Sequence, residues 1–216
     1  MKSSDSGSMI EFLFGVQRRL ANILRWNTTP RINTESVASH SYFVVLYSII
    51  ISDYIKANYN LSPDIEKVCK IAVLHDLEES FSGDIVASIK ASSVEFRNVL
   101  EDINLKVLDK IFDHFDNKDE YISYWKMSRD YSYLESKIVR VADLISQILY
   151  SFEEIKMGNS FMNDICENSV KHLRSFEDQW VQDMSANIEL FLQKHISFKN
   201  LNSKLFSHEF IAGEKY

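Results

Sequence analysis

The chain has 216 residues, of which 45 % are hydrophobic and 25 % are charged, a composition typical of a folded domain and not of a disordered chain. It contains only 5 Gly and 2 Pro, too few turn-forming residues for a barrel or a sandwich, so we expect an all-α fold. The formal net charge of −7 argues against binding to a nucleic-acid polymer, because such binding depends on Lys and Arg.

Apolar residues recur at helical spacing in seven segments: 10–24, 37–56, 64–77, 95–115, 119–127, 134–157 and 161–195. Thr34 or Ser36 is a candidate N-cap of the second segment, and Pro63 suits the start of the third. Gly158 is a candidate stop for the sixth segment. The last segment is long for one helix, so we expect a break within it.

These segments predict a single helical bundle over residues 9–198, without a repeat or a shift in composition. Residues 1–8 lack the apolar stretch of a signal peptide and are interpreted as a mobile tail or a remnant of cloning. Residues 199–216 form a polar C-terminal tail. The longest uncharged run, residues 36–52, is too short and polar to span a membrane, and two cysteines cannot form a disulfide framework. A reducing cytoplasm is therefore expected.

Two strong metal-ligand residue types, His75 and Asp76, are adjacent at the end of the apolar helix predicted over 64–77. Neighbours on a helix differ by about 100° around its axis, so this pair can reach one ion but cannot enclose it. Other helices must supply the remaining ligands. A single His-Asp pair is common by chance and does not by itself indicate a metal site.

Two further candidates, His40 and Asp143, lie within other apolar helical segments. A buried carboxylate needs a partner or a metal, although Asp143 could instead pair with Arg140, and a lone His is more often a core residue. Taken together, two imidazoles and two carboxylates form a mixed nitrogen and oxygen ligand set. Such a set suits Mn²⁺, Fe²⁺, Co²⁺, Ni²⁺ or Zn²⁺ and not Ca²⁺ or a thiolate-type zinc site.

The order His40, His75-Asp76, Asp143 resembles that of the HD-domain metal phosphohydrolases. The flanking residues Arg25-Trp26 and the segments 34–41, 75–84 and 142–159 narrow the resemblance to the 5′-deoxynucleotidases of the YfbR type. The similarity covers residues 20–159. The DatZ-type dATP triphosphohydrolases share this scaffold, so the resemblance does not separate the two activities.

The resemblance implies an all-α HD-domain bundle that hydrolyses the 5′ phosphoester of a small-molecule 2′-deoxynucleotide. A monophosphate would give a deoxynucleoside and phosphate, and a triphosphate such as dATP would give a deoxynucleoside and tripolyphosphate. It also implies one divalent transition metal, whose ligands would be His40, His75, Asp76 and Asp143.

The resemblance also implies roles for residues around the metal. Arg25 and Trp26 match the pair that places the substrate phosphate and sugar. Glu79 matches an acidic residue needed for turnover. Asp84 matches an acid that helps to hold water and substrate, and Lys90 could neutralise a phosphate.

The residue types are also consistent with phosphoester hydrolysis on chemical grounds. A metal polarises a phosphoryl oxygen and lowers the pKa of bound water towards ~7. Arg25 can bind phosphate with two parallel hydrogen bonds, and Trp26 offers a rigid face, although a core role for Trp26 is the alternative. Glu79 lies one helical turn beyond Asp76, so a helix continuing to it would project it towards the same pocket, where it could relay a proton.

One departure from the family pattern leaves other functions open. The family usually continues from the matching Asp with Leu-Pro-Thr, whereas this chain has Asp84-Ile85-Val86-Ala87 and lacks the Thr hydroxyl. The chain could therefore be a nucleotide-binding sensor or interaction module with little turnover, or a hydrolase of a signalling nucleotide. The base preference, the number of phosphates removed and the native metal are not fixed by the sequence.

Other polar and aromatic residues receive structural interpretations. Glu78 is expected to face solvent or an Arg, and Glu153 and Glu154 are expected to cap or pair. Arg31 is expected to be a solvated loop residue, with a phosphate contact as the alternative. The apolar stripe over 161–191 is expected to form core or a subunit interface, and the resemblance implies a homodimer.

Overall fold

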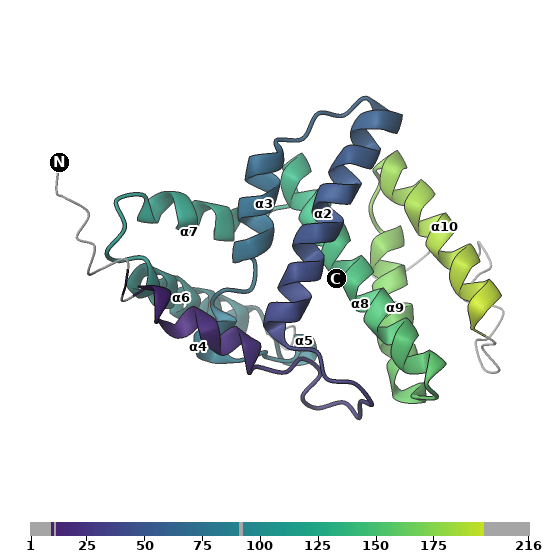
Figure 1. The fold of residues 1–216 in the computed structure, drawn as a ribbon, viewed down its shortest axis with the longest axis horizontal. Coiled ribbons are helices and arrows are strands. Elements are labelled where there is room, and N and C mark those ends of the chain that lie inside the picture. Colours follow the sequence, from purple (N-terminus) through teal and green to yellow (C-terminus); the bar gives the residue numbers. More distant parts are fainter. Residues whose placement is uncertain (1–9, 11, 91–92, 197–216) are drawn as a thin grey trace.

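The computed structural model describes residue 10, residues 12–90 and residues 93–196, so the tails expected over 1–8 and 199–216 lie outside the described residues. Within the described part the chain is helical and has no β-strand, which confirms the all-α prediction (Figure 1). The elements are η1 (Val16–Ala21), α2 (Val37–Tyr59), α3 (Ile65–Leu74), α4 (Glu79–Ser82), α5 (Ala87–Lys90), α6 (Val94–Ile111), α7 (Lys118–Met127), α8 (Leu134–Lys156), η2 (Ser160–Met162), α9 (Asn163–Arg174) and α10 (Gln179–His195).

The first predicted helix, over 10–24, is wrong in its extent. Gly15 interrupts the segment, and only the short 3-10 helix η1 follows it, with no buried residue. Leu13 and Phe14 are largely exposed. Phe12 and Leu20 are only partly buried against the core. Since apolar contacts supply most of the stability of a helix in a protein, these two contacts do not sustain a long helix here.

Helix α2 carries His40 into the interior. The Ser36 side chain accepts a hydrogen bond from the backbone N–H of Ser39, and the Ser39 hydroxyl accepts one from that of Ser36, so a capping box fixes the start of the helix. The buried residues of α2 recur at intervals of three and four: Val37, His40, Val44, Ser48, Ile51, Ser52 and Ile55. His40 therefore lies on the core-facing stripe, one turn from the start of α2.

Helix α3 ends sooner than the sequence predicts. Its buried stripe of Val68, Ile71 and Ala72 continues to His75, but the regular helix stops at Leu74 and His75 is its C-cap. A turn follows, and Glu79 begins the separate short helix α4. The helix predicted over 64–77 therefore ends three residues early, the condition of a helix continuing from Asp76 to Glu79 is not met, and a turn joins His75 and Asp76 to Glu79 at the start of α4.

The remaining long helices follow the predicted pattern. Gly158, with φ +99°, ends the α8 region, in agreement with its predicted role as a stop. The predicted break in the last segment is confirmed, because α9 ends at Arg174 and α10 begins at Gln179. No helix among the described residues is both long and apolar enough to cross a membrane.

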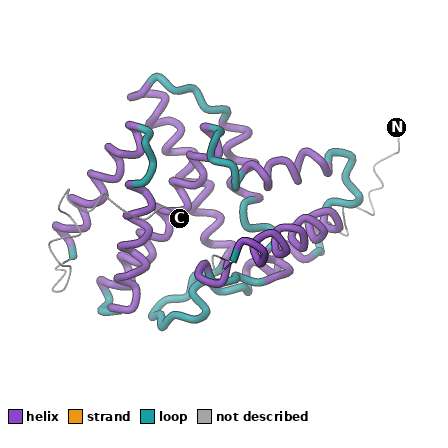
Figure 2. Tube along the Cα trace, turned by 180° about the vertical axis from the view of Figure 1, so that it is seen from behind, coloured by secondary structure: helices purple, strands orange, loops and turns teal. Residues whose placement is uncertain are grey.

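Two apolar clusters hold these helices together. The larger one joins α2, α3 and α8 to α9 and α10, which lie beside α8 in both views (Figures 1 and 2). The smaller one joins the end of α3 to α6 and α7, and its buried members are Leu74, Leu77, Leu108, Phe112 and Trp125. The turn after α3 therefore lies between the two clusters.

Candidate functional site

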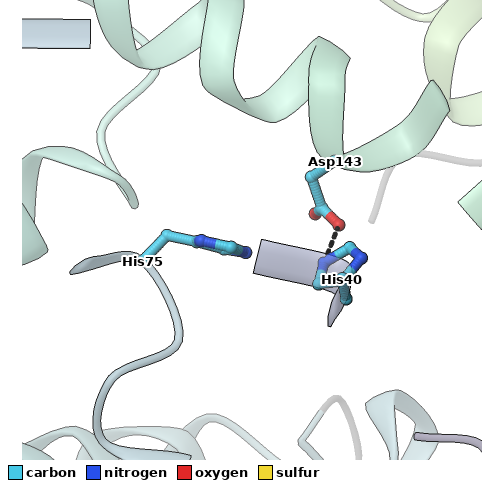
Figure 3. A group of neighbouring side chains, drawn as sticks. All are labelled: His40, His75 and Asp143. Atoms are coloured by element: carbon cyan, nitrogen blue, oxygen red, sulfur yellow. Dashed lines mark ion pairs between the residues drawn. The ribbon is translucent and has the colours of Figure 1, made fainter. Parts of the chain in front are cut away.

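Three candidate metal ligands meet from three parts of the chain. His40 comes from α2, His75 from the end of α3 and Asp143 from α8, and one possible ligand atom of each lies within 4.8 Å of the other two. Figure 3 shows the two imidazole rings and the carboxylate facing one another. The Nε2 atom of His40 lies 3.2 Å from Oδ1 of Asp143.

Asp76, the fourth predicted ligand, is not one of these three residues but lies beside them. Its Oδ2 lies 3.0 Å from Nε2 of His75 and 3.9 Å from Nε2 of His40. The Nε2 atoms of both histidines are buried and have no well-formed hydrogen bond within the described residues. Buried imidazole nitrogens that face two carboxylates are donors typical of sites for divalent transition metals, so these residues fit such an ion.

The imidazole of His40 is held from behind. Its Nδ1 lies 2.7 Å from Nη1 of Arg25 and 3.0 Å from the Ser146 hydroxyl. A guanidinium can only donate, so Nδ1 accepts in the contact with Arg25. In the other tautomer Nδ1–H donates to the Ser146 hydroxyl, and that is the tautomer whose Nε2 can bind a metal. Burial and the Arg25 charge lower the pKa of His40 to about 4, so the ring is neutral at pH 7. A neutral imidazole is the form that binds metals.

The His75 and Asp76 side chains form an ion pair. Burial alone would lower the pKa of His75, but the adjacent Asp76 carboxylate raises it to about 9. Burial would likewise raise the pKa of Asp76, but the positive charge of His75 holds it well below its usual value. The Nδ1 atom of His75 lies 2.7 Å from the carbonyl oxygen of Ala72, which directs Nε2 towards the site.

Two neighbours on α8 orient Asp143. Arg140 donates to Oδ2 at 2.5 Å, and the Gln147 amide donates to Oδ1 at 2.9 Å. The pairing of Asp143 with Arg140, expected as an alternative to a metal role, is thus present, and it leaves Oδ1 facing His40. Burial would raise the pKa of Asp143, but the contact with Nε2 of His40 and the Arg140 charge hold it well below its usual range.

Arg25 and Trp26 lie against this group. The Arg25 guanidinium donates to Oε2 of Glu35 at 2.9 Å and is only 8 % exposed. Trp26 has a positive φ of 58°, and its carbonyl oxygen accepts a hydrogen bond from Arg31 at 2.8 Å. Its ring lies nearly parallel to that of Tyr150, with 6.2 Å between centroids. Arg31 is therefore a loop-stabilising residue in this structure.

The loop that follows Trp26 is fixed by Glu154 on α8. This fully buried carboxylate accepts the backbone N–H groups of Ile32 and Asn33 at 2.7 and 2.6 Å. It also accepts the side-chain amide of Asn159 at 2.6 Å. The expectation that Glu154 pairs is confirmed, with backbone groups as its main partners.

Glu79, Asp84 and Lys90 follow the His75–Asp76 pair along the chain. Glu79 is buried, and Lys90 donates to its Oε1 at 3.2 Å. Burial, followed by the negative charge of Asp76, raises the pKa of Glu79 to about 9, so its carboxyl group is protonated at pH 7. The Asp84 carbonyl oxygen accepts a hydrogen bond from Asn27 at 3.1 Å, which joins the two loops.

Several contacts were not predicted from the sequence. Ser146 and Gln147 lie three and four residues after Asp143, a spacing that places them on the same side of α8, so helix periodicity could have indicated them. Glu35 and Arg129 carry no such local signal. Their partners, Arg25 for Glu35 and Glu78 for Arg129, are set by the tertiary packing and not by a local sequence pattern.

The chain is similar to known proteins over most of its length. The family model described as 5′-deoxynucleotidase YfbR-like matches residues 12–195. The 5′-deoxynucleotidase of Shewanella oneidensis is 26 % identical over 156 residues, covering 70 % of this chain and 78 % of the relative. That of Erwinia tasmaniensis is 25 % identical over 179 residues, covering 81 % and 87 %.

Solved structures share the fold. An HD-domain phosphohydrolase from Listeria innocua superimposes with a TM-score of 0.73 at 22 % identity, covering 85 % of this chain and 90 % of that one. The cyanophage S-2L HD phosphohydrolase DatZ, bound to dA and one catalytic Zn²⁺ ion, superimposes with a TM-score of 0.57 at 18 % identity, covering 83 % and 95 %.

Proposed function

The chain belongs to the YfbR-like 5′-deoxynucleotidase family, and we propose that it is a divalent-metal-dependent phosphohydrolase of 2′-deoxynucleotides that cleaves the 5′ phosphoester bond. The observation that carries this proposal is the buried group of His40, His75 and Asp143, with Asp76 beside it. A nearby guanidinium and a protonated carboxyl group supply the other functions that phosphoester hydrolysis needs.

We assign His40, His75, Asp76 and Asp143 as the residues that would hold one divalent transition metal. When bound, the ion would polarise a phosphoryl oxygen and make water a better nucleophile near neutral pH. Zn²⁺, Mn²⁺, Co²⁺, Ni²⁺ and Fe²⁺ all suit this ligand set.

Arg25 is suited to bind the substrate phosphate. Its contacts with Glu35 and His40 both use Nη1, so the Nη2 edge of the guanidinium could donate to phosphate oxygens. Because Glu35 and the surrounding core already hold this side chain, little conformational entropy would be lost when the phosphate binds. Trp26, over whose ring Arg25 lies at 4.9 Å, would contact the sugar or the base.

Glu79 is suited to transfer a proton. Burial and the Asp76 charge raise the pKa of its carboxyl group to about 9, which favours the protonated form that can donate to the 5′-oxygen as the P–O5′ bond breaks. The resulting carboxylate can then take back a proton from the attacking water, so the group returns to its starting state. Lys90, at 3.2 Å, would stabilise the carboxylate in between or interact with a phosphate. We assign Asp84 to hold the water or the substrate.

The test is product analysis across the four dNMPs and the four dNTPs with Mn²⁺ or Co²⁺. We expect release of deoxynucleoside together with phosphate or tripolyphosphate. The matching ribonucleotides and a cyclic nucleotide serve as controls for the sugar and for signalling nucleotides. Metal-loaded protein that binds a deoxynucleotide tightly but releases no product would contradict the proposal and favour a sensor.

We propose that the protein acts as a homodimer. Tyr42, Leu46 and Ile50 are exposed at intervals of four residues along α2, so they present one apolar face. Phe161 and Phe191 are also exposed, whereas Trp180 and Leu192 from the same predicted stripe are core residues. Light scattering at the 25.2 kDa mass of one chain would contradict this proposal.

A further inference from the structure

A buried carboxylate outside the ligand set holds the turn that carries the ligands. Glu78 lies between Asp76 and Glu79 and is only 3 % exposed. Its Oε1 accepts a hydrogen bond from Nη2 of Arg129 at 2.5 Å, and its Oε2 accepts one from Nε1 of Trp125 at 2.6 Å. Both oxygens of Glu78 thus accept hydrogen bonds from Trp125 on α7 and from Arg129 in the turn that follows α7, a part of the chain that supplies no candidate ligand.

Arg129 also contacts the backbone of a candidate ligand. Its Nη1 donates to the carbonyl oxygen of His75 at 3.3 Å and to that of Trp125 at 3.1 Å. Its guanidinium lies over the Trp125 ring, 3.6 Å from the ring centroid. Arg129 therefore links the His75–Asp76 peptide, Glu78 and α7 through one planar group.

The turn needs such support because it is not regular helix. Helix α3 ends at Leu74, and the carbonyl groups at the end of a helix have no partner within the helix. A cation placed there bonds to those carbonyl groups and also interacts favourably with the helix dipole. The support is rigid, since Trp125 is fully buried in the smaller apolar cluster beside Leu74 and Leu77.

We propose that Arg129, in the turn after α7, is a positioning residue that acts together with Glu78 and Trp125 to orient His75 and Asp76 for metal binding. Arg129 would touch neither the ion nor the substrate. From the proposed function, this inference takes only the assumption that a metal ion binds at His40, His75 and Asp143. Its consequence is that metal affinity depends on a residue more than 50 positions along the chain from the His-Asp pair.

Two conservative variants test this role. Arg129→Lys keeps the positive charge but loses the planar fork and its stacking on Trp125. Glu78→Gln keeps the shape of the side chain but removes its charge, and it serves as the second variant if Arg129→Lys does not fold. Because residues that orient metal ligands typically contribute 10–100-fold to affinity, we expect Arg129→Lys to bind Co²⁺ at least about tenfold more weakly. Glu78→Gln should change affinity in the same direction.

The matched control is Glu120→Gln. Glu120 on α7 pairs with Lys70 on α3 at 3.0 Å, so this pair joins the same two helices but lies at the surface, away from the turn. The affinity for Co²⁺ is measured by titration calorimetry, and the visible absorption of bound Co²⁺ reports its coordination geometry. Urea unfolding of each variant measures global stability.

We expect the absorption spectrum and affinity to change in Arg129→Lys and to stay at wild-type values in Glu120→Gln. Wild-type affinity and spectrum in a folded Arg129→Lys protein would overturn the inference. An equal loss of affinity in Glu120→Gln would also overturn it, because the effect would then follow helix packing in general. Wild-type protein that binds Co²⁺ but hydrolyses no nucleotide would contradict the proposed function alone.

Discussion

Replacing Glu154 with Gln should loosen the loop that begins at Trp26. Glu154 is fully buried, and its Oε2 accepts hydrogen bonds from the backbone N–H of Ile32 and from the side chain of Asn159. Its Oε1 accepts the backbone N–H of Asn33. In Gln one of these two oxygens becomes an NH₂ group, which cannot accept a hydrogen bond, so at least one N–H loses its acceptor.

The size of the effect follows from these contacts. A hydrogen bond to a charged group contributes about 1.5–3 kcal/mol, and a buried donor without a partner costs about 1–3 kcal/mol. Since the substitution leaves at least one buried donor without an acceptor, we expect Glu154→Gln to lower the free energy of unfolding by about 1–3 kcal/mol. We also expect a higher KM for the deoxynucleotide, because Trp26 is less well placed, and an unchanged metal affinity, because no candidate ligand contacts Glu154.

The effect should depend on pH. Burial alone would raise the pKa of Glu154, but the hydrogen bonds from Asn159, Ile32 and Asn33 bring it below the ordinary value of 4.5. A depressed pKa in the folded state means that the carboxylate stabilises the fold above pH 4.5 and that this contribution is lost as the pH falls through the folded pKa. The difference between wild type and Glu154→Gln should therefore be largest at neutral pH and should narrow in acid.

Urea unfolding and steady-state kinetics measure both parts of this prediction. Glu153→Gln is the matched control, because Glu153 is the exposed neighbour on the same helix and carries the same charge. We expect Glu153→Gln to stay within about 0.5 kcal/mol of wild type. If Glu154→Gln has the same unfolding midpoint and the same KM as Glu153→Gln, the loop is not held by this carboxylate and the reasoning is wrong.

Three further predictions concern the site itself. Asp143→Ala should abolish both metal binding and hydrolysis, which titration calorimetry and product release would show; retained metal binding would remove Asp143 from the ligand set. Glu79→Ala should still bind metal and deoxynucleotide but lose turnover, and a fully active variant would refute the proton-transfer role. Because the pKa of His75 is about 9, the metal must displace its proton at neutral pH, so apparent metal affinity should rise up to about tenfold per pH unit between pH 7 and 9. Calorimetry in two buffers of different ionisation enthalpy should show release of about one proton per ion, and no release would contradict the assignment.

The sequence was sufficient for features that depend on local periodicity. His40 continues the apolar stripe of α2, and His75 continues that of α3, so the pattern that predicts the helices also predicts that both imidazoles point inward. Gly158 ends its helix because a residue with positive φ is needed there. These inferences use neighbours within one or two helical turns.

The sequence was insufficient where burial depends on distant segments. The segment over 10–24 has helical spacing, but Leu13 and Phe14 are not covered by any of the described elements, and only a short 3-10 helix forms. Glu78 was expected to face solvent or an Arg, and the structure confirms that it pairs with an Arg. Which Arg this is, Arg129, depends on how α7 packs against α3. Such partners are separated by 51 residues, and no local pattern relates them.

The candidate ligands come from three separate helices: α2, the end of α3, and α8. This arrangement has a consequence for the lifetime of the protein in a cell. An ion bound there would join segments that separate when the chain unfolds, so it would bind the native state and not the unfolded one. At a metal concentration 100-fold above Kd, such binding adds about 2.7 kcal/mol to the stability of the native state. We therefore expect proteolytic degradation of this protein to accelerate when the supply of its metal falls, so that scarcity would lower its abundance as well as its activity.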